Sequence, residues 1–258
     1  MIESLTDVDA FRKRRAAAWA DNVDYWLTKP LRHVDDVGSF IVERVISAAT
    51  RVRKRTPSIL DVGFGNAWLL AALEQQRFQC AYTGIDSLQA FVTRARLRHS
   101  TNRCAQFLCA DIEAPLDIGL HADVVVNAFN FFEVADLSQA MRNTAQHLSG
   151  DGTLMISTID KTYLILALSR DWSEFHENLR RYQELEGTKY AFQPIDEGSR
   201  VSNALEYPSV LYSTDDYLRA ATANGLALVR HFEHVHTAKL VPKIYLHLEF
   251  RRTRSSEA

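Results

Sequence analysis

The sequence is short of cysteine, of excess charge and of long apolar runs, and each shortage argues against a class of protein. Its 258 residues include three cysteines, an odd number without metal-type spacing, which indicates a reducing compartment. Thirty basic side chains against 32 acidic ones give a formal net charge of −2, which disfavours a polyanion as partner. No apolar run approaches the roughly 20 residues of a membrane span, and the acidic N-terminal stretch is unlike a signal peptide. We therefore expect a cytoplasmic protein with no membrane or nucleic-acid partner and no metal site.

Strand-like and helical patterns alternate between about residues 58 and 158. The strand-like runs are 58–62, 81–86, 105–111, 122–129 and 152–158, and the helical patterns between them are 66–76, 87–99 and 137–148. Such alternation is typical of a parallel sheet with helices on both faces, and the apolar run around 124–126 fits a strand buried on both sides.

The flanking segments differ from this alternating part. Residues 5–54 read as helical, with breaks expected at Pro30 and Gly38, and residues 159–212 are polar and aromatic. A helix over 213–225 precedes two strand-like runs, 226–236 and 243–252, which predict an antiparallel hairpin. The predicted fold is thus α/β, a doubly wound seven-stranded, mostly parallel sheet with an antiparallel last strand. Its predicted parts are an N-terminal helical cap (1–56), an α/β domain (57–158 and 213–252) and an inserted lid (159–212).

Two glycines, Gly63 and Gly65, follow the first strand-like run, where a glycine-rich turn lets the backbone approach a ligand closely. The dinucleotide fingerprint G-x-G-x-x-G would need a third glycine where this chain has Trp68. The sequence also contains no G-x-x-x-x-G-K-[ST] phosphate loop. Both observations disfavour a ligand with a pyrophosphate group.

Acidic residues stand at the ends of three successive strand-like runs, at Asp61, Asp86 and Asp111. Asp86 follows Gly63 by 23 residues, a spacing at which a carboxylate accepts hydrogen bonds from ribose hydroxyls. Asp111 is positioned to accept from an adenine amino group, and the amide of Ile112 to donate to the ring. A ligand with a ribose and an amino acid but no phosphate fits this pattern.

In the order and spacing of these motifs the chain resembles the class I S-adenosylmethionine-dependent methyltransferases. Asp61, Gly63 and Gly65 match the family's acid-x-Gly-x-Gly-x-Gly motif, with Ala67 in place of its last glycine. A positive φ at that position would put strain on an alanine. The resemblance implies S-adenosylmethionine as cofactor, S-adenosylhomocysteine as product, and a set of cofactor-binding residues: Asp61, Gly63, Gly65, Asn66, Asp86, Ser87, Asp111, Ile112, Asn127 and Tyr25.

The methyl acceptor is expected beyond the fourth strand, around residues 127–133 and under the lid. Methyl transfer from a sulfonium mainly requires alignment and exclusion of water, so catalytic residues leave little trace in a sequence. The candidate bases are Glu133, for which a helix-start acid is an equal alternative, and His176, for which a solvated helix face is the stronger alternative. The candidate substrate-binding residues are Trp26, Phe131, Phe132, Trp172 and Tyr212.

These features predict a methyltransferase acting on oxygen or nitrogen of a small molecule, such as a natural product. The basic stretches 12–15 and 94–99 spread around their helices and are read as solvated surface. The segment "NAFN" also lacks the Asn-Pro-Pro-aromatic motif of enzymes that methylate amines in nucleic acids. An RNA or protein methyltransferase and a non-enzymatic methyltransferase-like binding module stay open as alternatives, as does a homo-oligomer.

Overall fold

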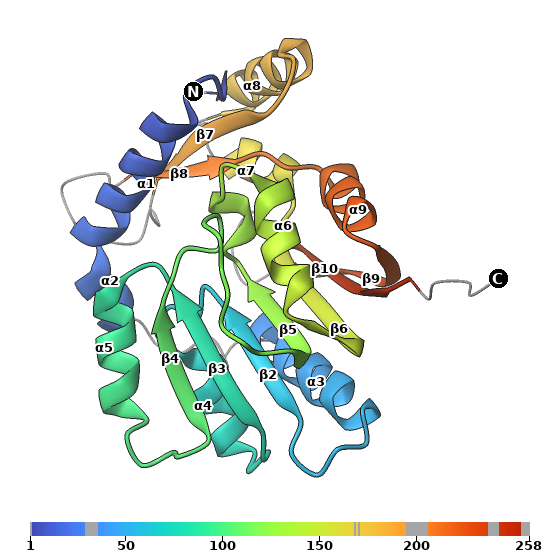
Figure 1. Cartoon of the computed structure of the whole chain (residues 1–258). Coiled ribbons are helices and arrows are strands. Elements are labelled where there is room, and N and C mark those ends of the chain that lie inside the picture. Colours follow the sequence, from blue (N-terminus) through green and yellow to red (C-terminus); the bar gives the residue numbers. More distant parts are fainter. Residues whose placement is uncertain are drawn as a thin grey trace.

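The computed structural model describes residues 2–28, 36–167, 169, 171–194, 206–236 and 243–253, and a seven-stranded sheet forms its centre (Figure 1). The strand order is β4-β3-β2-β5-β6-β10-β9. The bounds of these strands are β2 Ser58–Val62, β3 Ala81–Asp86, β4 Ala105–Cys109, β5 Ala122–Ala128, β6 Leu148–Ile159, β9 Leu226–His236 and β10 Lys243–Arg252. Strands β2 to β6 pair in parallel, whereas β10 is antiparallel to both β6 and β9. The predicted α/β fold with an antiparallel last strand is confirmed.

The strand order reverses between β2 and β5, and open α/β sheets bind ligands at such a switch point. From β2 the chain proceeds outward to β3 and β4, and then returns to the other side of β2 to form β5. The loops that leave β2 and β5 therefore diverge and open a crevice at the carboxyl ends of these strands. This is where the glycine turn and the fourth-strand segment lie.

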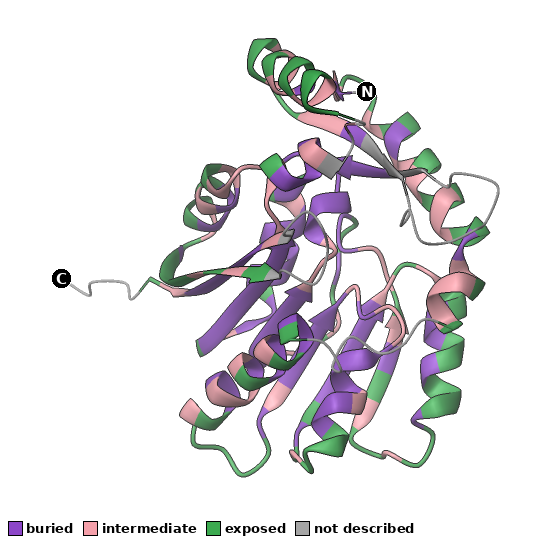
Figure 2. Cartoon of the chain, turned by 180° about the vertical axis from the view of Figure 1, so that it is seen from behind, coloured by how far each residue is buried: buried purple, intermediate pink, exposed green. Residues whose placement is uncertain are grey.

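Helices cover both faces of the sheet. The first face packs against α3 (Asp36–Arg51), α4 (Trp68–Gln75) and α5 (Gln89–Arg98), and the second against α6 (Leu137–Gln146) and α9 (Thr214–Ala223). Figure 2 shows that burial is concentrated in the strands between these layers. Sheets buried on both faces consist of nearly continuous apolar runs, as the fully buried residues Val124, Val125 and Val126 illustrate.

The expected helix break at Gly38 is wrong, because Gly38 is buried in the first turn of α3. A glycine costs a helix only about 1 kcal/mol relative to alanine. The buried face of α3, which includes Ile41, Val42 and Val45, outweighs that cost. Pro30, the other expected break, lies outside the described residues.

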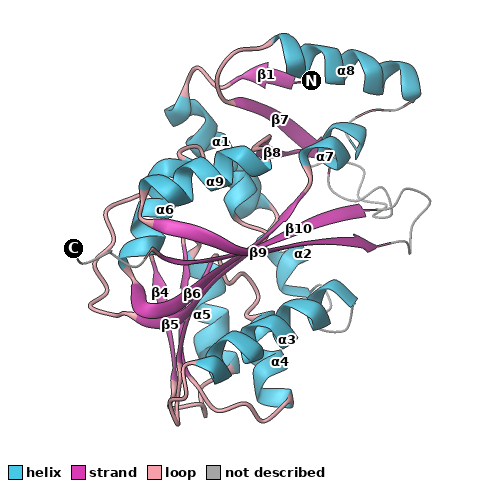
Figure 3. Cartoon of the chain, turned by 90° about the vertical axis from the view of Figure 1, so that its right-hand side faces the viewer, coloured by secondary structure: helices cyan, strands magenta, loops and turns pink. Residues whose placement is uncertain are grey.

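A second, three-stranded sheet joins the N-terminus to the segment after β6 (Figure 3). Its order is β1-β7-β8, and all of its pairs are antiparallel. The elements of this region are β1 Ile2–Ser4, α1 Val8–Asp21, α2 Val23–Thr28, α7 Lys161–Ala167, α8 Trp172–Glu184, β7 Lys189–Pro194 and β8 Glu206–Val210. The sequence predicted the N-terminal helices but not this sheet. Among the described helices, none has the length and apolar character needed to cross a membrane.

Candidate cofactor site

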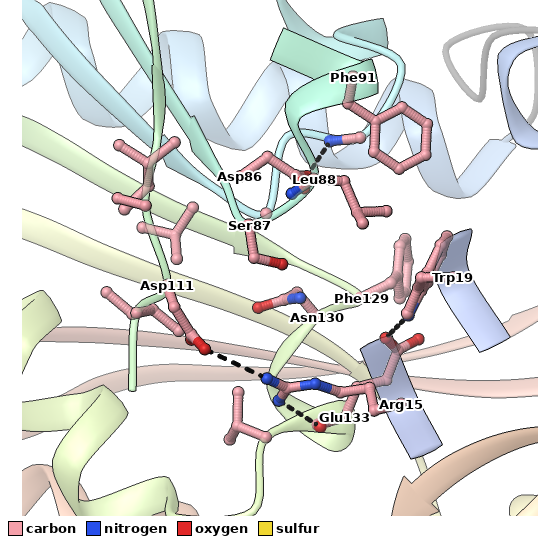
Figure 4. A pocket seen from close by; sticks show the side chains of 17 residues that line it. Arg15, Trp19, Asp86, Ser87, Leu88, Phe91, Asp111, Phe129, Asn130 and Glu133 are labelled. Atoms are coloured by element: carbon pink, nitrogen blue, oxygen red, sulfur yellow. Dashed lines mark hydrogen bonds and ion pairs between the residues drawn. The ribbon is translucent and has the colours of Figure 1, made fainter. Parts of the chain in front are cut away.

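A cavity lies between the carboxyl ends of the central strands and helix α1 (Figure 4). Figure 4 shows Arg15 and Trp19 of α1 on one side and Asp86, Ser87 and Leu88 on the other. The residues that line the cavity are Arg15, Trp19, Val62, Gly63, Gly65, Ile85, Asp86, Ser87, Leu88, Phe91, Ala110, Asp111, Ile112, Phe129, Asn130, Glu133 and Val134. They come from α1 and from the carboxyl ends of β2, β3, β4 and β5, together with the segments that follow these strands, and the sheet edge brings them together.

The glycine turn after β2 needs both of its glycines, for different reasons. Gly63 has a φ of +71°, and a Cβ there would lie 2.6 Å from Cγ of Asn130. Gly65 has a φ of +55°, and no atom of the described residues lies within 4 Å of the place its Cβ would take. Because Gly65 lines the cavity, that open space is where a ligand can approach the backbone.

Ala67 also has a left-handed backbone, with a φ of +58° directly before α4. The strain anticipated for an alanine at this position is therefore present, at a cost of roughly 1–2 kcal/mol. The methyl group of Ala67 is fully buried, and Trp68 beside it packs into the core on the same face of the sheet. Core packing thus compensates for the missing third glycine.

Asp86 is held in place at the edge of the cavity by two backbone amides. Its Oδ2 accepts from the amide of Gly65 at 3.0 Å, and its Oδ1 accepts from the amide of Leu88 at 2.9 Å. Burial raises the pKa of Asp86 to about 6, so the side chain is mostly ionised at neutral pH. An oriented carboxylate beside the glycine turn suits the two hydroxyls of a ribose.

Asp111 meets helix α1 at the next strand end. Its Oδ1 accepts from the amide of Glu113 at 2.9 Å, and its Oδ2 lies 3.5 Å from Nη2 of Arg15. Arg15 also donates to the carbonyl oxygen of Glu133 at 2.9 Å. The guanidinium of Arg15 therefore bridges the loop after β4 and the loop after β5.

Glu133 belongs to the short helix η2 (Phe131–Glu133) and its carboxyl group is buried in the cavity wall. Oε2 of Glu133 accepts from Nε1 of Trp19 at 2.5 Å. Burial raises the pKa of Glu133 to about 8, against the opposing effects of Trp19 and Arg15. At neutral pH the group is mostly protonated, and it becomes a proton acceptor at mildly alkaline pH.

Of the residues predicted to bind the cofactor, six line the cavity and four do not. Those in the lining are Gly63, Gly65, Asp86, Ser87, Asp111 and Ile112. Those outside it are Asp61, Asn66, Asn127 and Tyr25.

Two of the four are buried behind the cavity wall. Asp61 is 2% exposed and accepts a 2.5 Å hydrogen bond from the hydroxyl of Tyr82, and burial raises its pKa to about 7. Asn127 is fully buried, donates to the carbonyl of Val62 at 3.2 Å and accepts from the amide of Phe131 at 3.0 Å. Asn127 therefore braces the loop after β5, whereas Asp61 links β2 to β3.

Most of the predicted acceptor-site residues also lie elsewhere. Phe131 belongs to the core beneath α6, Phe132 is buried, and Trp26 packs against Trp19 with ring centroids 5.4 Å apart. The hydroxyl of Tyr212 donates to the carbonyl of Val134 at 3.0 Å, behind the cavity wall. Of the predicted substrate and catalytic residues, only Glu133 lines the cavity.

Trp172 and His176 require a correction, because the structure does not bring them to the cavity. Both lie on α8, where Trp172 is 69% exposed and His176 is also exposed. The amphipathic helix α8 instead turns Phe175 and Leu179 toward a small apolar core that includes Leu164. The solvated-face alternative for His176 is the arrangement observed.

The sequence interpretation missed the contribution of α1 to this site. The charge pattern of the stretch 12–15 predicts solvated surface, yet the Arg15 side chain is only 13% exposed and faces the cavity. Arg15 and Trp19 are four residues apart and share a helix face, which was the available signal. Phe129, another missed lining residue, has a φ of +65° directly after β5, an uncommon conformation that marks a constrained site.

The comparisons with known proteins agree with this geometry. Residues 60–156 match the family described as "Methyltransferase domain". The chain is 28% identical over 143 residues to a malonyl-[acyl-carrier protein] O-methyltransferase of Bacillus anthracis, covering 55% of this chain and 48% of that protein. It is 29% identical over 157 residues to a ubiquinone biosynthesis O-methyltransferase of Rickettsia prowazekii, covering 60% of each. The matched part thus spans about half to three fifths of these relatives.

Solved structures share the fold along nearly the whole chain. An S-adenosylmethionine-dependent methyltransferase from Clostridium acetobutylicum aligns over 95% of this chain and 99% of its own, with a TM-score of 0.61 and 13% identity. A 1,6-didemethyltoxoflavin-N1-methyltransferase from Burkholderia thailandensis, solved with its substrate and S-adenosylhomocysteine, aligns over 97% and 92%, with a TM-score of 0.59 and 13% identity. At such low identity these alignments establish the fold.

Fold and site together define a Rossmann-like α/β protein with a nucleoside-type cavity at its topological switch point. Residues 60–156 match the methyltransferase-domain family, and the fold is shared with an S-adenosylmethionine-dependent methyltransferase of known structure. The predictions of the family and of its cofactor class are therefore confirmed.

Proposed function

We propose that this protein is a methyltransferase that uses S-adenosylmethionine to methylate oxygen or nitrogen of a small molecule. The observation that carries the proposal is the convergence of Gly65, Asp86 and Asp111 on one cavity from three successive strand ends. A fold alone does not determine function, but this set of side chains suits a ribose and an adenine without phosphates.

Each part of the cavity has a role in this proposal. The ionised Asp86 accepts from the ribose hydroxyls, while Asp111 and the amide of Ile112 bind the adenine edge. The turn at Gly63 and Gly65 lets the backbone approach the amino-acid part of the ligand. When bound, S-adenosylmethionine supplies a methyl group that is already activated by the sulfonium.

Glu133 is the proposed proton acceptor of the site. It lies in the cavity wall, and its pKa of about 8 makes it a proton acceptor at mildly alkaline pH. Such a base is needed for a hydroxyl acceptor, whereas an unprotonated amine reacts without one. Helix α1 covers the cavity through Arg15 and Trp19 and so excludes water from it.

The acceptor is proposed to be a small molecule, bound between the cofactor cavity and the lid of residues 159–212. Two solved neighbours support this class: a 1,6-didemethyltoxoflavin-N1-methyltransferase and a glycopeptide N-methyltransferase. The two curated relatives described above are O-methyltransferases. The atom that is methylated in this protein is therefore proposed only as oxygen or nitrogen.

Calorimetry with S-adenosylhomocysteine tests the first step of the proposal. We expect saturable binding to the wild-type protein and loss of at least about 100-fold in affinity for Asp86→Ala, because charged hydrogen bonds to both hydroxyls are removed. Asp151→Ala, at an exposed position in β6, is the matched control and should bind normally. Absence of binding to the wild-type protein would refute the proposal.

A second experiment identifies the acceptor. The protein is incubated with S-adenosylmethionine and fractionated metabolites, and products heavier by one methylene group are sought by mass spectrometry. Products must require both cofactor and protein and must disappear with Asp86→Ala. If wild-type protein binds the cofactor but modifies only RNA or protein fractions, the small-molecule assignment is wrong.

A further inference from the structure

Glu113 is a buried carboxylate that lies behind the cavity wall and does not itself line the cavity. Its side chain is 2% exposed. Its Oε1 accepts from Nη2 of Arg12 at 3.1 Å and from the amides of Ala135 and Asp136 at 3.0 and 2.9 Å. Its Oε2 accepts from Nη1 of Arg15 in a second, shorter ion pair. A buried carboxylate is tolerated only with such a complete set of partners.

The contacts of Glu113 join three chain segments, and each segment contributes to the cofactor cavity. Helix α1 supplies Arg15 and Trp19, the loop after β4 supplies Asp111, and the loop after β5 supplies Glu133. Glu113 itself follows Asp111 by two residues and receives hydrogen bonds from both of the other segments. A single side chain therefore fixes the relative positions of three parts of the wall.

The charge of Glu113 is part of this arrangement. Although burial opposes ionisation, the guanidinium of Arg15, the amide of Asp136 and the guanidinium of Arg12 hold the pKa of Glu113 below its ordinary value. A neutral amide in its place would accept weakly from two guanidinium groups and would itself bring an N–H donor facing them. Arg15 would then lose the partner that orients it toward Asp111.

We propose that Glu113 is a positioning residue for the cofactor: it holds Arg15 and, with it, helix α1 against the adenine end of the cavity. This inference rests on the proposed function, because it assigns the Asp111 end of the cavity to adenine. Glu113 acts through Arg15 and touches no ligand itself. Removal of the Glu113 carboxylate should therefore weaken cofactor binding, because Arg15 would lose its position in the cavity wall.

The chain offers a matched control in Glu249 on β10. The Glu249 side chain is likewise 2% exposed; its Oε1 pairs with Arg44 at 2.5 Å, and its Oε2 lies 3.8 Å from Arg51 and 3.9 Å from Arg230. None of these four residues lines the cofactor cavity. Replacing either glutamate by glutamine breaks a buried ion pair, but only one of the two pairs organises the cavity.

The test compares Kd for S-adenosylhomocysteine, by calorimetry, and the midpoint of thermal unfolding for Glu113→Gln and Glu249→Gln. We expect both variants to unfold at lower temperature, and only Glu113→Gln to raise Kd, by about tenfold or more. Equal Kd values for Glu113→Gln and wild type, or equal losses for both variants, would overturn the inference. Failure of the wild-type protein to bind refutes the proposed function instead, so the two failures are distinguishable.

A double-mutant cycle adds a measurement that a purely structural role would leave unchanged. If Glu113 acts through Arg15, Glu113→Gln raises Kd in the wild-type background but adds no further loss to Arg15→Gln. Independent, additive losses would contradict this route. Should Glu113→Gln not fold, Arg12→Gln removes one partner of Glu113 at a side chain that does not line the cavity. It should raise Kd about two- to threefold, and an unchanged Kd would overturn the inference.

Discussion

The cofactor cavity has two walls that are held by different kinds of contact. The strand-end wall consists of residues at the ends of β2, β3 and β4, and the helix wall consists of Arg15 and Trp19 of α1. In the strand-end wall, Asp86 accepts from backbone amides that are 21 and 2 residues away, at Gly65 and Leu88. In the helix wall, Arg15 and Trp19 of α1 reach carboxylates that are 98 and 114 residues away, at Glu113 and Glu133. The strand-end wall therefore forms as a direct consequence of sheet formation. The helix wall depends on a few side-chain contacts between distant segments, so substitutions there should tune binding and leave the sheet intact.

The largest effect is expected from blocking the strand-end wall at Gly65. In Gly65→Leu the side chain would enter the open space of the cavity, and we expect cofactor affinity to fall at least about 100-fold. Gly119→Leu is the control, because Gly119 also has a positive φ (+60°) and open space around it but does not line the cavity. In both variants the strain of a leucine in the left-handed conformation should lower the free energy of unfolding by about 1–2 kcal/mol.

Calorimetry with S-adenosylhomocysteine and chemical denaturation on both variants separate strain from blockage. If Gly119→Leu also loses binding, strain rather than occupation of the cavity explains the effect. If Gly65→Leu binds normally, the glycine turn is not the floor of the site.

The next effect is the pH dependence that the strand-end wall imposes. Burial gives Asp86 a pKa of about 6 in the free protein, and hydrogen bonds from ribose hydroxyls would favour its ionised form. Ligand binding therefore weakens as pH falls through about 6, and Kd for S-adenosylhomocysteine should rise by up to tenfold per pH unit below that value. Calorimetry between pH 5 and 8 measures the slope. Asp86→Asn should bind weakly with no slope, and a slope that persists in this variant would assign the titration to another group.

A smaller effect is expected from the helix wall at Trp19. Trp19→Phe keeps an aromatic side chain, although a smaller one, and removes the Nε1 hydrogen bond to Glu133, at a cost of about 1 kcal/mol, or roughly fivefold in Kd. Loss of that donor should also raise the pKa of Glu133 above about 8, because the bond from Trp19 lowers it.

Trp26→Phe is the matched control for this change. Trp26 packs against Trp19 but does not line the cavity, and its replacement should leave Kd within about twofold of wild type. Equal losses in the two variants would show that packing of α1, and not the hydrogen bond to Glu133, decides the affinity.

The contrast between the walls also explains which parts of the site the sequence predicts. Gly63, Gly65, Asp86 and Asp111 are set by local geometry: a turn after a strand, and an acid at each strand end. Parallel pairing then brings these strand ends to one edge of the sheet, so their convergence follows from the order of the elements alone.

The contribution of α1 could not be predicted in the same way. The stretch 12–15 has basic side chains all round the helix, and only its docking decides that Arg12 and Arg15 meet Glu113 while Lys13 and Arg14 face outward. A pairing between residues about 100 positions apart leaves no periodic signal in one sequence.

Residue type alone also misled the sequence interpretation where burial decides the role. Asp61 and Asn127 are an acid and an amide near the glycine turn. Side chains of these types can either bind a ligand or brace the protein. The structure buries both, and their bonds to Tyr82 and Val62 use them as braces. Likewise, an aromatic residue such as Trp172 can line a pocket or lie on an exposed helix face. In the structure Trp172 lies on the exposed face of α8.

The smallest effect concerns Ala67, where the strand-end wall departs from the family motif. Ala67→Gly removes about 1–2 kcal/mol of left-handed strain but also a buried methyl group of about 0.8 kcal/mol, so the free energy of unfolding should change by about 1 kcal/mol or less. Ala72→Gly removes an equally buried methyl from a right-handed position inside α4 and should cost about 2 kcal/mol. Urea denaturation measures the difference. Equal destabilisation by the two substitutions would mean that Ala67 carries no strain, and that the chain does not need glycine in the third position of its turn.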